Sequence, residues 1–135
     1  MKPDVKQMKS VTLAYMGDAV YEKHVREHLI SQGKVKVKQL HQSAVRFVNA
    51  EAQAAVIHEW IEHGQLSNEE LAVVRRGRNA KAGSVPKHTT VQAYRYSTAF
   101  EALMGFLYLA GQHQRLESLI HRAIDHIEKG ASDIE

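Results

Sequence analysis

Two segments of this chain are apolar on every face of a helix, and each contains a single acidic residue. The first is LAYMGDAVY, over residues 13–21, and its acid is Asp18; the second is AFEALMGFLYLAG, over residues 99–111, and its acid is Glu101. Helices that are apolar all round lie in the middle of a domain or at a subunit interface. The fold must therefore bury both segments and supply partners for both acids, because an isolated buried carboxylate is costly.

The rest of the sequence predicts an all-α fold of five to seven helices. Ser10 is a suitable N-cap for a helix to about Ile30, and SNEE at 67–70 fits a capping box that opens a helix to about Arg76. Glycines mark the expected helix ends, and residues 77–90 read as a loop. The predicted helices cover about 10–30, 37–47, 50–63, 67–76, 90–110 and 115–129, and the glycines that end them are Gly33, Gly64, Gly111 and Gly130.

Composition narrows the class of protein. The 135 residues are 44% hydrophobic, and no repeat or linker divides them, so we expect a single domain over 1–135. Cysteine is absent, which excludes disulfides, a thiolate nucleophile and Cys-ligated zinc. The longest apolar run, 102–110, is shorter than the roughly 18 residues of a membrane span, and the N-terminus lacks a signal-peptide core. We expect a cytoplasmic protein with no membrane partner.

One long segment of the chain carries only positive charge. Residues 71–100 contain no Asp or Glu, although the net charge of the whole chain is only +3. Such a concentration is typical of a surface that binds a polyanion, and a solvated basic loop is the alternative. The basic residues of the segment are Arg75, Arg76, Arg78, Lys81, Lys87, His88 and Arg95.

Asp18 and Glu101 have two possible kinds of partner. Each could form a buried ion pair, with Lys23 or Arg95 as the cation, or a hydrogen bond to a neighbouring helix. Glu22 adds a second acid one turn beyond Asp18, and this local negative excess favours a bound cation instead. Mg²⁺ is the natural candidate, since it takes a few carboxylates and completes its shell with water and phosphate oxygens. Periodicity places Asp18 on a stripe expected to face the core, which it shares with Val11, Ala14, Tyr15, Tyr21, Val25 and Leu29.

A second metal pattern is weaker. HVREH, over residues 24–28, matches the inverted zinc-protease pattern H-x-x-E-H and would place His24 and His28 on one helix face. The neighbouring Lys23, Arg26 and Glu27 instead indicate an ordinary solvated surface, and a short motif needs a confirming structural context.

Two separated segments resemble the ribonuclease III family. LAYMGDAVYE resembles its signature segment, E-x-L-E-F-L-G-D-A, and STAFEALMGFLYL resembles its second segment, D-x-x-E-A-L-I-G-A-x-x-L. The chain is similar to the minimal branch, Mini-ribonuclease III, across nearly its whole length. The segments that carry this similarity are AYMGDAVYE, GRNAKAG-x-x-PK and YRYSTAFEALMGFLYL.

The resemblance implies a homodimeric, Mg²⁺-dependent endoribonuclease that cleaves double-stranded RNA. It implies that Asp18 and Glu101 bind the metal and are catalytic, and that Tyr15 and Met16 form part of the dimer contact. The branch lacks a separate RNA-binding domain, so we expect the chain to consist of the catalytic domain alone. The branch trims the 5′ and 3′ ends of precursor 23S ribosomal RNA with help from a large-subunit ribosomal protein, which would be the partner here.

The sequence departs from the broader family at three acidic positions, where it has Val11, Ala14 and Thr98. The number of metal ions is therefore left open. These departures also motivate an alternative function, a non-catalytic ribonuclease III-like scaffold that binds RNA or the ribosome. A third possibility, a purely structural helical dimer, would bind neither RNA nor metal. If the protein is an endoribonuclease, the residues expected to contact the RNA phosphates are Arg75, Arg76, Arg78, Lys81 and Lys87.

Overall fold

The computed structural model describes residues 4–80 and 84–134, with side chains as far as residue 130. Within these residues the protein is helical throughout and contains no strand, which confirms the predicted all-α class and helix number. No helix in this part of the chain is long and apolar enough to cross a membrane. The elements are η1 (Val5–Gln7), α1 (Ser10–Ser31), α2 (Val37–Val48), α3 (Ala50–Glu62), α4 (Asn68–Asn79), α5 (Val91–Leu109) and α6 (His113–Ile134).

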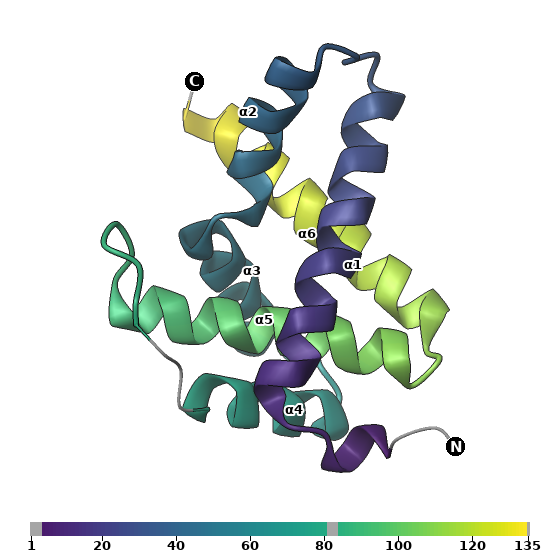
Figure 1. Ribbon diagram of the computed structural model, residues 1–135, viewed down its shortest axis with the longest axis vertical. Helices are drawn as coiled ribbons and strands as arrows, with labels where there is room; N and C mark the ends of the chain where they lie inside the picture. The colour runs from purple at the N-terminus through teal and green to yellow at the C-terminus, as the bar shows by residue number, and fades with distance from the viewer. Residues whose placement is uncertain (1–3, 81–83, 135) are drawn as a thin grey trace.

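Helix α5 is the centre of the molecule. It crosses α1 and packs against α3, α4 and α6 (Figure 1). Eleven of its nineteen residues are buried, which explains why its sequence is apolar on every face. The ring of Phe100 joins its neighbours: it makes an edge-on contact with Tyr21 of α1 at 4.8 Å and stacks on Trp60 of α3 at 5.8 Å.

Helices α1 and α5 touch through their backbones. A Cβ atom on Gly17 would overlap the carbonyl group of Glu101, and one on Gly105 would overlap the carbonyl group of Leu13. Only a residue without a side chain fits at either position, so the two glycines set the distance between the helices. A third glycine does the same for α4, because a Cβ on Gly77 would lie 2.8 Å from the Cα of Ala99.

Helix α4 is fixed at its N-terminal end. Ser67 and Glu70 form the predicted capping box, in which each side chain binds the backbone N–H of the other residue. The carboxylate of Glu70 is 4% exposed and also accepts two 2.9 Å bonds from Arg115 of α6. The N-terminal end of α4 is thereby held to α6, and its arginine-bearing end packs on α5 through Gly77.

Some predicted helix ends were correct and two were wrong. Gly33, Gly64 and Gly111 have φ values of 90°, 63° and 76°, the left-handed conformation that ends a helix. Gly77 instead lies inside α4, because its missing side chain permits the contact with α5, so the expected loop begins after Asn79. Gly130 does not take a left-handed φ, and α6 continues past it to Ile134.

The N-terminal half of α1 also differs from its prediction. Ser10 is the first helical residue, and the N-cap is Lys9, which provides no side-chain hydrogen bond. The expected core-facing stripe is divided: Val11 is 48% exposed and Tyr15 is 81% exposed, whereas the stripe is buried further along the helix. The reason is that α1 contacts α5 through the face of Leu13 and Gly17, which turns the Asp18 face outward at the crossing.

Candidate active site

The helix crossing brings the two lone acids together. Gly17 lies against the carbonyl of Glu101, so Asp18, the next residue in α1, lies beside the Glu101 side chain. Asp18 is exposed and Glu101 is partly buried, which leaves the pair open to solvent on the α1 side. Two carboxyl groups that are 83 positions apart in sequence therefore lie side by side, at a point where the core meets the solvent.

The electrostatics of this pair are unfavourable without a cation. Burial raises the pKa of Glu101, and the negative charge of Asp18 and a hydrogen bond between the two carboxyl groups raise it further, to about 8. No arginine or lysine compensates: among the described residues neither acid forms an ion pair within 4.0 Å. The buried ion pair considered from sequence is therefore not formed, since Lys23 pairs with Glu27 at 2.6 Å.

Gln53 is a site residue that sequence reasoning missed. It lies on α3, is 1% exposed, and favours the ionised form of Glu101, against the effect of burial. Its Nε2 group nevertheless makes no hydrogen bond of ordinary geometry within the described residues, so it lies near Glu101 without being aligned to it. Its signal was the same as for the two acids, since Gln53 is a lone polar residue within the apolar run AQAAVI.

The pair fits a magnesium ion. One or two carboxylates, with water and substrate phosphate at the other positions, are the usual ligands of Mg²⁺. A positive ion between the two groups would remove the repulsion that raises the pKa of Glu101. No group of three or more His, Cys, Asp or Glu side chains in the described chain is arranged to hold a metal, so Asp18 and Glu101 would supply the protein ligands. Glu22 does not join them, because it pairs with Arg26 at 2.9 Å.

The zinc pattern in α1 is not assembled. His28 Nε2 lies 3.0 Å from the carboxylate of Glu128 on α6, and His24 Nδ1 lies 2.9 Å from the carbonyl of Val20. The two ring nitrogens thus have separate partners, and the described residues hold no metal-ligand cluster here.

The three positions where the family has further acids contribute no carboxylate. Ala14 is buried, and Val11 lies at the surface beside the N-terminal segment. The Thr98 hydroxyl donates to the Tyr94 carbonyl at 3.0 Å within its own helix. These positions therefore add no carboxylate to Asp18 and Glu101.

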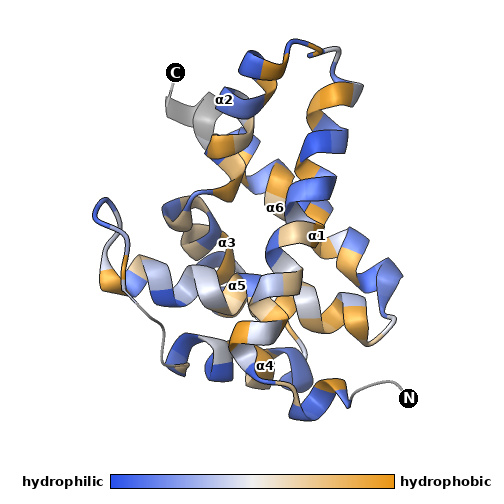
Figure 2. Ribbon diagram, in the orientation of Figure 1, coloured by the Kyte–Doolittle hydropathy of each residue, from blue (hydrophilic) through white to orange (hydrophobic). Residues whose placement is uncertain are grey.

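The basic residues lie on helix α4 and on the segment that follows it. Arg75, Arg76 and Arg78 occupy the last turns of α4, the hydrophilic end of this helix in Figure 2, so Arg78 lies in the helix rather than in the predicted loop. The guanidinium of Arg78 lies 6.0 Å above the ring of Tyr96, which orients it. Lys87 is exposed on the connection to α5, and Lys81 lies outside the described residues.

Tyr15 and Met16, the expected dimer contacts, differ in exposure. Tyr15 projects from α1 with 81% of its surface exposed, whereas Met16 is partly buried against the core. Tyr15 stands one turn before Asp18 on the same side of the helix. A subunit that covered Tyr15 would therefore lie next to the carboxylate pair.

Comparison with known proteins identifies the class. The family model for the ribonuclease III domain matches residues 11–112, which include both acids and both glycines of the helix crossing. A protein from Fusobacterium nucleatum with a solved crystal structure is 27% identical and superimposes with a TM-score of 0.81 over 93% of this chain and 98% of its own. The chain belongs to the ribonuclease III family.

The relatives also identify the branch. Mini-ribonuclease 3 of Symbiobacterium thermophilum is 51% identical over 89% of this chain and 91% of its own length. Mini-ribonuclease 3 of Enterococcus faecalis is 42% identical over 92% of this chain and 94% of its own length. The resemblance to the Mini-ribonuclease III branch is thus confirmed, and the protein is an endoribonuclease of the ribonuclease III type. This family acts on double-stranded RNA and generally depends on divalent metal ions.

Proposed function

We propose that this endoribonuclease cleaves double-stranded RNA with Mg²⁺ held by Asp18 and Glu101. The observation that carries the proposal is the convergence of two unpaired carboxyl groups, one of them with a pKa raised to about 8, at a backbone contact between two helices. When bound, Mg²⁺ would activate a water molecule and stabilise charge on the oxygens of the phosphodiester.

The protein residues have separate roles in this proposal. Asp18 is exposed and faces the substrate side, so it orients the phosphodiester and the attacking water relative to the site. Glu101 is held by its burial in α5, and the buried amide of Gln53 on α3 lies beside it and favours its ionised form. The contact of Gly17 with Glu101 fixes the separation of the two groups before substrate binds.

The duplex is bound through its backbone. Arg75, Arg76 and Arg78 on α4, with Lys81 and Lys87 in the following segment, are proposed to contact phosphates and 2′-hydroxyls. The supporting observation is that the segment carrying these residues, 71–100, contains no Asp or Glu. A-form RNA is recognised through shape and backbone rather than base edges, so we expect little sequence selectivity from these contacts.

The working unit is proposed to be a homodimer in which residues 1–135 form one catalytic domain. Exposed Tyr15 and the adjacent Met16 would lie at the two-fold contact, so that each subunit cuts one strand. By analogy with the branch, we propose that the enzyme trims the 5′ and 3′ ends of precursor 23S ribosomal RNA in the cytoplasm. A large-subunit ribosomal protein would assist this cleavage.

The test compares cleavage by three proteins. Duplex RNA is incubated with Mg²⁺ and the parent, Asp18→Asn or the control Asp125→Asn, whose carboxylate on α6 pairs with Lys129 at 3.3 Å. A metal ligand stabilises the transition state by several kcal/mol, so Asp18→Asn should slow cleavage by at least about 100-fold and the control should not. Duplex that the parent binds but leaves intact would instead support the alternative scaffold, for which the missing acids at Val11, Ala14 and Thr98 are the favouring observation.

A further inference from the structure

Gln53 is a buried side chain whose amide does not contribute to the stability of the fold. It lies on α3, is 1% exposed, and belongs to the apolar run AQAAVI, so its surroundings are those of a core residue. Its Nε2 group forms no hydrogen bond within the described part of the chain. A buried donor without a partner makes folding less favourable, and an apolar side chain of similar size would avoid that cost. The amide therefore calls for a role other than packing.

The packing of α3 places this amide at the carboxylate pair. Gln53 and Trp60 are about two helical turns apart on the same buried face of α3. Trp60 stacks at 5.8 Å on Phe100, the residue before Glu101, so this face of α3 lies against α5 next to the site. The amide itself lies beside the Glu101 carboxyl group. Glu101 thus has the exposed Asp18 of α1 as one neighbour and the buried Gln53 of α3 as another.

The amide of Gln53 is suited to hold one of the two carboxylate oxygens of Glu101. An N–H group next to a carboxylate forms a charge-assisted hydrogen bond, which is stronger than a bond between neutral groups. The terminal torsions of glutamine and glutamate have broad energy minima, so a small rotation of either group aligns the donor at little cost. An oxygen held in this way leaves the second oxygen of Glu101 for a cation shared with Asp18. Hydrogen bonds to the ligating carboxylates are the usual support of a metal site.

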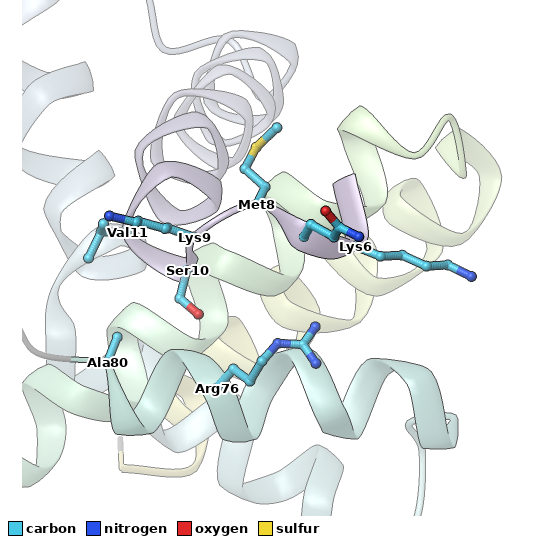
Figure 3. Close-up of a pocket in the computed structure, with 8 residues that line it drawn as sticks. Lys6, Met8, Lys9, Ser10, Val11, Arg76 and Ala80 are labelled. Carbon is cyan, nitrogen blue, oxygen red and sulfur yellow. The ribbon is translucent and has the colours of Figure 1, made fainter. Parts of the chain in front are cut away.

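Gln53 is separate from the surface proposed to hold RNA. Arg76 of that surface lines a pocket where η1 and the first turn of α1 meet α4 (Figure 3), and Gln53 is not among the residues that line this pocket. Its 1% exposure also prevents direct contact with a nucleic acid. A change at Gln53 is therefore expected to act through Glu101 and to leave the affinity for duplex RNA unchanged.

We propose that Gln53 is a positioning residue, whose Nε2 group donates a hydrogen bond to one oxygen of Glu101 and directs the other oxygen toward a divalent cation shared with Asp18. This inference rests on the proposed function, because the amide has this role only if Asp18 and Glu101 hold a metal ion. Gln53 then acts on metal affinity and on the orientation of Glu101, without touching the metal or the RNA.

The first experiment measures metal binding without RNA. Melting temperatures of the parent and of Gln53→Met are followed in EDTA and over a series of Mg²⁺ concentrations at constant ionic strength. Methionine is unbranched like glutamine but has no donor, and Gln53→Leu is measured in parallel so that the result does not depend on one side chain. Both variants should be at least as stable as the parent in EDTA, and both should need about tenfold more Mg²⁺ for half of the maximal stabilisation. The matched control is Gln42→Met, at an exposed glutamine on α2 away from the helix crossing (Figure 1), and it should follow the parent.

The second experiment separates positioning from a purely structural role. Rates of duplex cleavage are measured over a range of RNA concentrations, at limiting and at high Mg²⁺. At limiting Mg²⁺, Gln53→Met should lower kcat about tenfold and leave KM for the duplex within about twofold of the parent value. High Mg²⁺ should restore most of the lost kcat, because excess metal compensates for a weaker site.

The outcomes distinguish this inference from the proposed function. An equal Mg²⁺ dependence of the parent and both Gln53 variants, with a parent that cleaves duplex RNA, overturns the role of Gln53 alone. A parent that Mg²⁺ neither stabilises nor activates overturns the proposed function and this role with it. Variants that are less stable than the parent in EDTA, with a loss of kcat that is the same at every Mg²⁺ concentration, overturn the positioning role in favour of a structural one.

Discussion

Glu101 occupies an environment that opposes its ionisation. Burial in α5 and the neighbouring Asp18 both favour the protonated form, and they raise its pKa to about 8. In the unfolded chain the same carboxyl ionises near pH 4.3. The folded protein without metal therefore retains a proton that the unfolded chain releases, and the difference acts against folding as the pH rises.

Glu101→Gln should stabilise the metal-free protein, and the gain should depend on pH. Because the folded-state pKa is raised, the destabilisation by Glu101 grows between about pH 4.5 and 8 and is constant above that range. Solvent screens part of the repulsion, so we expect a gain of about 1 to 2 kcal/mol at pH 8.5 and almost none at pH 4.5. Urea unfolding in EDTA measures it, with the exposed Glu62→Gln as control; an equal gain at both pH values would contradict the expected cause.

The acids of the site could be predicted from the sequence, but its supporting residues could not. Asp18 and Glu101 stand out because each is the lone charge in an apolar segment. Gln53 is likewise a lone polar residue in an apolar segment, but a single glutamine in an alanine-rich helix does not by itself indicate a functional site. Only the packing of α3 against α5 places it beside Glu101.

At the scale of the elements, the position of the site depends on the crossing of α1 and α5. The apolar patterns of both helices predicted that they would be central, and this holds for α5 and for the buried face of α1. The patterns could not predict which face of α1 would contact α5. That choice is made by Gly17 and Gly105, which allow the backbones to touch and turn Tyr15 and Asp18 outward.

Gly17→Ala should separate the helices at the site. The added methyl group would overlap the carbonyl of Glu101, and neither backbone can yield as a flexible side chain would. We expect a loss of at least about 3 kcal/mol, which lowers the melting temperature by about 10 °C. The control is Gly130→Ala, at a helical position with open space around it, which should stabilise the protein by up to about 1 kcal/mol. Equal melting temperatures for the two variants would be incompatible with a backbone contact.

The attachment of α4 to α6 gives a second prediction at this scale. Burial alone would raise the pKa of Glu70, but hydrogen bonds from Arg115 and Ser67 outweigh it and hold the pKa below its usual value. A lowered folded-state pKa stabilises the protein above the unfolded pKa, and this contribution disappears as the pH falls through the folded value. Glu70→Gln should therefore cost about 1 to 3 kcal/mol at pH 7 and much less near pH 3.

Urea unfolding of Glu70→Gln at the two pH values measures this effect. Glu69→Gln is a suitable control, because Glu69 is the adjacent residue and is exposed. Its one ion pair is a surface contact with Lys6 at 3.7 Å, which contributes little. A similar loss in both variants at pH 7 would mean that the bonds from Arg115 and Ser67 contribute little.

For the whole molecule, we propose that the basic end of α4, the carboxylate pair and the exposed Tyr15 act together in binding RNA and the second subunit. The charge pattern predicted an RNA-binding region, which stays a proposal, and it placed Arg78 in a loop although this residue lies in α4. The packing of Gly77 on Ala99 extends α4 and thereby mounts the arginines on a rigid helix. A single sequence cannot predict such a contact, because a glycine that ends a helix cannot be distinguished from a glycine that allows two helices to pack closely.

Tyr15→Arg should convert the proposed dimer to a monomer. An aromatic ring with 81% of its surface exposed on a central helix gains by being covered, and a charge at that position would have to be desolvated in the interface. Sedimentation or light scattering should give the mass of a dimer for the parent and of a monomer for the variant. Tyr108→Arg, at a tyrosine that is 41% exposed at the end of α5, should keep the parent mass. A parent protein that sediments as a monomer would contradict the dimer directly.

The backbone contact at Gly17 and Gly105 has a practical consequence for inhibition. No layer of side chains stands between the two helices, so nothing there can be compressed or repacked to accommodate a new molecule. A compound with two cationic groups designed to bridge both carboxyl groups would face a target of constant width, and its linker length would decide whether it engages one acid or two.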